Sequence, residues 1–150
     1  MLDFLKKAGV TFYLNVAAGL LALIGWIIYL VTNATAGYAI VGGGVGIALG
    51  LLAVLMIAGA AYTSIRFGAQ HYITAAIKIA AMVFVMVTLG VLLLDRVGLA
   101  SSLLTWDSHN ALGWSVFNTS IVCAVFLLLS AITLIVCAFF KNEKAETANA

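Results

Sequence analysis

The chain has 150 residues, of which 65% are hydrophobic and only 8% are charged, and its mean hydropathy is +1.23. Soluble domains carry about 25% charged residues, so this composition excludes a soluble globular protein and predicts an integral membrane protein. The formal net charge of +2 is too small, and its basic residues are too scattered, to indicate nucleic-acid binding. No stretch outside the apolar segments is long enough for a soluble catalytic domain.

Four apolar runs are long enough to cross a membrane as helices, which takes about 20 residues each. They cover about 10–31, 39–62, 73–94 and 114–140. Residues 1–9 form a short cytoplasmic head, and the run after it is too long for the core of a signal peptide, which predicts an uncleaved anchor. Residues 95–113 form an outer loop, and residues 141–150 form a polar tail that we expect to be disordered. The predicted fold is all-α, a compact bundle of four transmembrane helices over residues 10–140.

The second run carries a series of regularly spaced glycines. Gly42, Gly46 and Gly50 recur every four residues, and Ala53 continues nearly the same face, which therefore has almost no side-chain bulk. Small residues let helix backbones approach closely in lipid, where association depends on packing and hydrogen bonds. This face is predicted to pack against another helix of the same chain or against a neighbouring subunit.

Stripes of small or polar residues at a spacing near 3.5 mark the other three runs. Such stripes favour close, left-handed helix packing. In chain order they are Thr11, Asn15, Ala18, Ala22 and Gly25; then Thr74, Lys78, Ala81, Val85 and Thr88; and finally Thr119, Cys123, Phe126, Ser130, Thr133 and Cys137. The two cysteines lie about 21 Å apart along one helix, so they cannot form a disulfide with each other.

The basic residues predict the orientation. With four spans, the head, the second connection and the tail share one side of the membrane. Six basic residues lie on or near that side, and only Arg96 lies on the other: Lys6, Lys7, Arg66, Lys78, Lys141 and Lys144. Because cytoplasmic segments are enriched in Lys and Arg, both termini are predicted to be cytoplasmic in a multi-pass protein of the plasma (inner) membrane.

A few polar side chains inside the apolar runs are candidates for a polar pathway or a partner contact. They are Asn15, Lys78, Thr88, Ser130 and Thr133. Lys78 is the only basic residue within a run, and charges inside membranes are often functional. It also lies about one and a half turns from the cytoplasmic end, where a lysine can extend to the headgroups. Asn15, at a comparable depth, can equally serve as a hydrogen-bonding contact between helices.

The outer loop is the largest segment expected outside the membrane. Asp95 and Arg96 at its start are typical of a membrane stop signal, although such a pair could also gate or bind an ion. Residues 99–106 could form a short amphipathic segment on the outer leaflet or on a partner, or a plain interfacial loop. The residues predicted to make outer-loop contacts are Trp106, Asp107, His109 and Trp114.

The chain lacks the residue sets that carry common chemistry. It has no Cys-x-x-Cys pair, no phosphate-binding glycine loop, and no motif of a metalloprotease or a serine hydrolase. We therefore expect no enzyme, no cofactor and no metal site. The predicted function is assembly in the bilayer, as an accessory or scaffolding subunit of a larger membrane complex or as a homo-oligomer. The alternative is a small oligomeric channel or transporter for an ion or small solute, and the predicted partners are lipid and other membrane subunits or copies of the chain.

Overall fold

The computed structural model describes residues 9–67 and 71–139, which form an all-α four-helix bundle. Its helices are α2 (Val10–Ala34), α3 (Gly43–Arg66), α4 (Tyr72–Thr105) and α5 (Ala111–Phe139). All four are long and apolar enough to cross a membrane, which confirms the predicted all-α bundle of four such helices and indicates a multi-pass membrane protein in contact with lipid. The predicted disordered tail, residues 1–8 of the predicted head, and the basic residues Lys6, Lys7, Lys141 and Lys144 lie outside the described residues.

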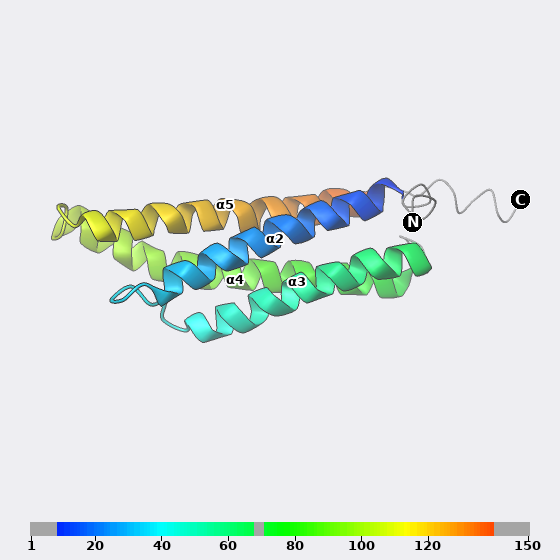
Figure 1. Cartoon of the computed structure of the whole chain (residues 1–150), viewed down its shortest axis with the longest axis horizontal. Coiled ribbons are helices and arrows are strands. Elements are labelled where there is room, and N and C mark those ends of the chain that lie inside the picture. Colours follow the sequence, from blue (N-terminus) through cyan, green and yellow to red (C-terminus); the bar gives the residue numbers. More distant parts are fainter. Residues whose placement is uncertain (1–8, 68–70, 140–150) are drawn as a thin grey trace, which may run out of the picture.

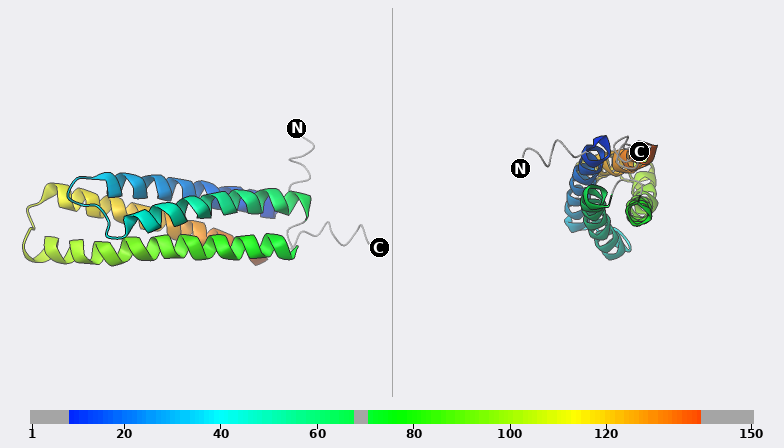
Figure 2. Two further views of the ribbon diagram at one scale, coloured as in Figure 1. Left: turned by 90° about the horizontal axis from the view of Figure 1, so that it is seen from below. Right: turned by 90° about the vertical axis from the view of Figure 1, so that its right-hand side faces the viewer.

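The helices run up and down and close into a ring (Figures 1 and 2). Each helix packs against the one before and the one after it, and α5 packs against α2. At the terminal end of the bundle, α2 begins, α5 ends and α3 is followed by α4. At the other end, here called the connection end, lie the α2–α3 connection (35–42) and the α4–α5 connection (106–110).

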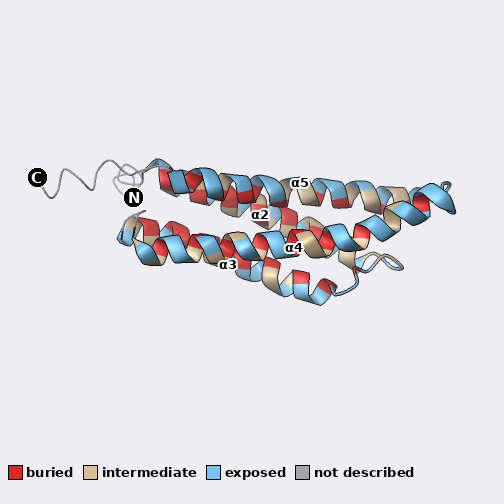
Figure 3. Cartoon of the chain, turned by 180° about the vertical axis from the view of Figure 1, so that it is seen from behind, coloured by how far each residue is buried: buried red, intermediate tan, exposed pale blue. Residues whose placement is uncertain are grey.

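The interior of the bundle is built from small and polar side chains at heptad-like spacing. In α2 the buried residues include all five members of the predicted stripe, and the same is true of α4. Buried positions recur along every helix (Figure 3). Because many of the buried side chains are small, the helix backbones approach closely, and most of the large aliphatic side chains are left on the outside, where lipid lies. A few large side chains are buried as well, among them Ile57, Leu92 and Leu127. The bundle is thus held by close packing in its interior.

Two aromatic side chains of α2 fill the glycine face of α3. Trp26 donates its indole N–H to the Ile47 carbonyl oxygen at 3.0 Å, and the Tyr29 hydroxyl lies 3.4 Å from the Gly43 carbonyl oxygen. A Cβ atom added at Gly46 would collide with the Tyr29 hydroxyl, and one added at Gly50 would collide with the Trp26 ring. The glycines therefore leave the space that the aromatic rings of the same chain occupy.

α3 begins at Gly43, four residues after the start expected for the second span. Gly42 caps the helix with φ +74°, a backbone conformation that glycine adopts without steric cost, so it lies outside the helix. Its place on the packing face is taken by Gly43, where a Cβ would collide with the Asn33 side chain. The side-chain amide oxygen of Asn33 also accepts a hydrogen bond from the Ile40 backbone N–H at 3.0 Å, which fixes the entry to α3.

α4 is longer than the third apolar run and does not end at Asp95 and Arg96. It has 34 residues, so it is about 51 Å long, and only 106–110 separate it from α5. The expected outer loop is therefore mostly helical. Leu103 of the added segment is buried close to Gly113, so α4 and α5 stay packed as they extend past α2 and α3 (Figure 2).

Candidate functional site

Arg96 is the centre of a buried polar network at the connection end. Its guanidinium donates from Nε to the Ser120 hydroxyl oxygen at 2.9 Å and from Nη2 to the Tyr38 carbonyl oxygen at 3.1 Å. Nη1 lies 3.2 Å from a carboxylate oxygen of Asp95, whose other oxygen accepts from the Val41 backbone N–H at 2.9 Å. Arg96 is only 5% exposed. The pair expected to be a stop signal therefore joins α4 to α5 and to the α2–α3 connection.

Tyr38 extends this network to the α4–α5 connection. Its hydroxyl oxygen accepts from the Asn110 side-chain amide at 2.7 Å, and the same amide lies 2.6 Å from a carboxylate oxygen of Asp107. The Trp114 indole N–H donates to the Ser108 carbonyl oxygen at 3.0 Å. Asp107 and Trp114, two of the predicted outer-loop residues, thus hold the connection itself.

The other two predicted outer-loop residues have no role in these contacts. Trp106 is 91% exposed, and His109 is exposed as well. They lie at the tip of the α4–α5 pair, which we define as residues 101–109. The structure thus separates the predicted set into two residues that fix the connection and two that face outward.

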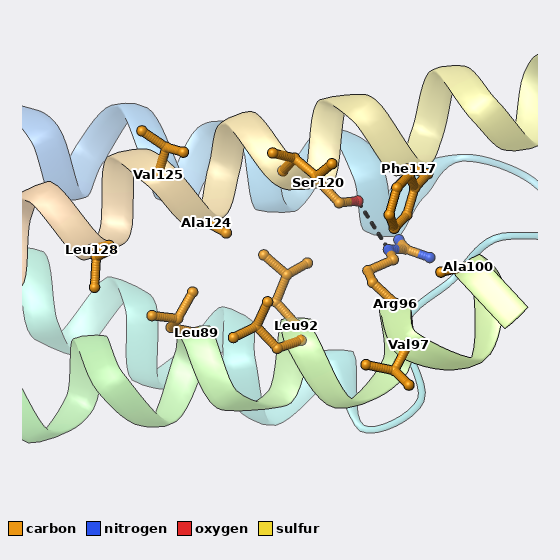
Figure 4. Close-up of a pocket in the computed structure, with 12 residues that line it drawn as sticks. Leu89, Leu92, Arg96, Val97, Ala100, Phe117, Ser120, Ala124, Val125 and Leu128 are labelled. Atoms are coloured by element: carbon orange, nitrogen blue, oxygen red, sulfur yellow. Dashed lines mark hydrogen bonds between the residues drawn. The ribbon is translucent and has the colours of Figure 1, made fainter.

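An apolar groove of about 460 Å³ lies between α4 and α5 and reaches Arg96 at the connection end (Figure 4). Its floor includes Leu89 and Leu92, which are buried, and its rim includes the more exposed Val97 and Val125. Among the residues that line it, only Arg96 and Ser120 are polar. The groove is therefore an apolar surface depression along the side of the bundle, with one arginine, Arg96, among its lining residues.

A second polar cluster lies at the terminal end. The Lys78 ammonium lies 3.5 Å from the Cys137 sulfur, and the Cys137 thiol donates to the side-chain amide oxygen of Asn15 at 3.2 Å. Lys78 is only 8% exposed, so its side chain turns into the bundle and does not extend along the surface to the headgroups. The Asn15 amide nitrogen is buried and has no hydrogen-bond partner among the described residues.

The remaining members of the predicted pathway set lie elsewhere. The Thr88 hydroxyl donates to the Phe84 carbonyl oxygen of its own helix at 2.9 Å, and Ser130 donates across to the Ala18 carbonyl oxygen at 2.8 Å. Thr133 is half-buried and bonds within α5 to the Leu129 carbonyl oxygen. The structure therefore brings Asn15 and Lys78 together, while Thr88, Ser130 and Thr133 make separate contacts.

Sequence reasoning missed the groove and the inward direction of Arg96. A signal for Arg96 was present, because the stripe of α4 continues from Thr88 through Leu92 to Arg96 at helical spacing. Ser120 likewise lies three residues before Cys123 on the buried side of α5. The Tyr38 carbonyl had no such signal, because the partners of a backbone atom in a connection depend on how the helices are arranged.

Neither polar cluster has the composition of a metal centre. Within residues 9–67 and 71–139, no three His, Cys, Asp or Glu side chains lie close enough together to hold a metal ion. A scan against protein-family models, a search of curated proteins and a search of solved structures found no match to this chain.

Proposed function

We propose that this protein acts by assembly in the membrane, as an accessory or scaffolding subunit of a larger membrane complex or as a homo-oligomer, and that it catalyses no reaction. The observation that carries the proposal is the tip of the α4–α5 pair. Leu104 is 71% exposed and Trp106 is 91% exposed there, on a segment that extends past the other two helices. Exposed large apolar side chains that cluster outside the lipid layer are typical of a docking surface.

The position of the tip relative to the bilayer follows from the length of α4. This helix has 34 residues and is about 51 Å long, whereas a bilayer with its headgroup layers is about 40–45 Å thick. At the connection end α4 also extends past α2 and α3 (Figure 2). The tip therefore reaches the aqueous phase, where Leu104 and Trp106 gain most from contact with a protein partner.

The orientation in this proposal rests on the basic residues. Arg66 is exposed at the terminal end, and the four lysines of the head and tail adjoin the same end in sequence. An excess of Lys and Arg favours the cytoplasmic side, so both termini are cytoplasmic and the tip projects from the outer face of the plasma (inner) membrane.

The first test is the mass and composition of the complex that a C-terminally tagged copy brings out of its native membrane in mild detergent. We expect a stoichiometric assembly, with other membrane proteins or with further copies of the chain. A variant with Leu104→Ser and Trp106→Ser is expected to elute as a monomer because it loses the apolar surface of the tip. The matched control carries Ser101→Ala and Ser108→Ala, which alter the same tip without removing its large apolar side chains.

Two results would contradict this proposal. A wild-type chain that leaves its native membrane as a bare monomer would argue against assembly altogether. An assembly that survives the Leu104→Ser and Trp106→Ser changes intact would show that docking does not depend on the tip.

A channel or transporter is the second candidate, and the terminal-end cluster is the observation that favours it. A buried ammonium and an amide nitrogen without a hydrogen-bond partner lie close to one thiol, and polar groups inside membranes often mark solute paths. If the protein acts only by assembly, liposomes that contain it should show no ion flux above that of empty vesicles. Flux that Lys78→Met abolishes and the control Thr133→Val preserves would favour the channel instead.

A further inference from the structure

We propose that the groove between α4 and α5 holds one acyl chain of a membrane phospholipid, with the phosphate of that lipid at the Arg96 guanidinium. This inference is independent of whether the tip docks on a partner. It rests on the dimensions of the groove, on the chemistry of its lining and on the position of its single cation.

The dimensions fit a single chain. Along α4 the groove extends from Leu89 to Ala100, and the part between Leu89 and Arg96 covers seven residues or about 10 Å. This length is about a third of a hydrocarbon core of about 30 Å. The groove, with a volume of about 460 Å³, therefore has room for the first part of one extended chain below a headgroup at Arg96.

The lining suits hydrocarbon along its whole length. Leu92 on the floor is fully buried, while Val97 and Val125 on the rim are 68% and 48% exposed, so the groove opens sideways (Figure 4). A lipid chain can enter from the bilayer without passing through water. Because bulk lipid is equally apolar, contact with leucine alone gives little preference for the groove. Specificity must come from a polar contact at its end.

Arg96 supplies that contact. A guanidinium has five N–H donors. Each of its three nitrogen atoms uses one N–H in the contacts to Ser120, Tyr38 and Asp95 described above, which leaves two N–H groups without an acceptor among the described residues. A phosphate suits this site because hydrogen bonds from guanidinium to phosphate are charge-assisted.

The nearby carboxylate does not block this contact. One carboxylate oxygen of Asp95 accepts from the Val41 backbone N–H of the α2–α3 connection, and the other contacts the guanidinium. The carboxylate partly neutralises the charge of Arg96. Asp95 can therefore keep both contacts while a phosphate binds the remaining N–H groups.

The test is native mass spectrometry of the protein in mild detergent, after delipidation and return of phosphatidylglycerol. We expect one phospholipid adduct per chain. Ala124→Phe and, separately, Ala100→Phe place a phenyl ring in the groove and are expected to lower adduct occupancy at least about tenfold. The matched control is Ala48→Phe, which adds the same ring to an exposed position of α3 and should retain the lipid. Circular dichroism and gel filtration establish that each variant keeps the fold.

Further probes separate the sources of the signal. Inorganic phosphate alone is expected to give no adduct, because the chain supplies most of the contact area. Adduct formation with phosphate alone, or equal lipid occupancy in Ala124→Phe, Ala100→Phe and the wild type, would overturn the proposal. So would a wild-type chain that binds no phospholipid while the groove variants lose a protein partner, since the groove would then receive side chains of that partner.

Discussion

Replacing Arg96 with methionine is expected to lower the free energy of unfolding by about 3–5 kcal/mol, the usual cost of removing one partner of a buried ion pair. Methionine keeps much of the volume but leaves the Asp95 carboxylate without its cation. The Ser120 hydroxyl and the Tyr38 carbonyl also lose their donor. The measurement is unfolding of the purified chain in mixed micelles of a mild detergent and sodium dodecyl sulfate, followed by circular dichroism.

Two further variants assign the loss to the buried charge. Arg66→Met removes an exposed arginine whose only described contact is with the Tyr62 hydroxyl at 3.0 Å, and it should change stability by less than about 1 kcal/mol. Asp95→Asn combined with Arg96→Met removes both charges and should recover part of the loss. If Arg96→Met proved as mild as Arg66→Met, the connection-end network would not hold the bundle together.

Much of the bundle was predictable because small and polar residues are informative in a membrane helix. Lipid-facing positions accept any large apolar side chain, whereas buried positions admit only what fits between backbones. Thr11, Asn15 and Ala18 on α2, like Thr74 and Lys78 on α4, are therefore recognisable from spacing alone, and the structure buries all five.

The register of α5 was harder to predict because small residues there occur in adjacent pairs. Thr119 and Ser120 are neighbours of similar size, and the sequence does not show which of them faces inward. The structure buries Ser120, Leu127 and Leu134, each one residue after the expected Thr119, Phe126 and Thr133, while Cys123, Ser130 and Cys137 lie where the stripe placed them. Packing against α2 decides between the two choices, and it involves residues about 100 positions away.

The direction of the charged side chains was only partly predictable, because helical spacing places Lys78 and Arg96 on the buried stripe while their positions near the ends of an apolar run also suit the headgroups. A charged residue near the end of an apolar run can face either the headgroups or the interior of the bundle, and the sequence of Lys78 and its neighbours is compatible with both directions. Only the position of Cys137 and Asn15 on neighbouring helices shows that it turns inward. Arg96 is the same case, since its acceptors come from α5 and from the α2–α3 connection.

The second large effect is expected at the contact between α2 and α3. Gly46→Ala should lower the free energy of unfolding by about 1–3 kcal/mol, because the added methyl group would overlap the Tyr29 hydroxyl. Tyr29 is fully buried and cannot easily move aside. The same micellar unfolding assay measures the change.

Gly59→Ala is the matched control, since it places the same methyl group in the same helix where nothing lies within 4 Å. It should leave stability unchanged or raise it by up to about 1 kcal/mol, because alanine is the better helix former. A double-mutant cycle then locates the cause. In a Tyr29→Leu background the shorter side chain frees the space above Gly46, so Gly46→Ala should cost less there than in the wild type. Equal costs in both backgrounds would mean that the ring of Tyr29 does not require the glycine.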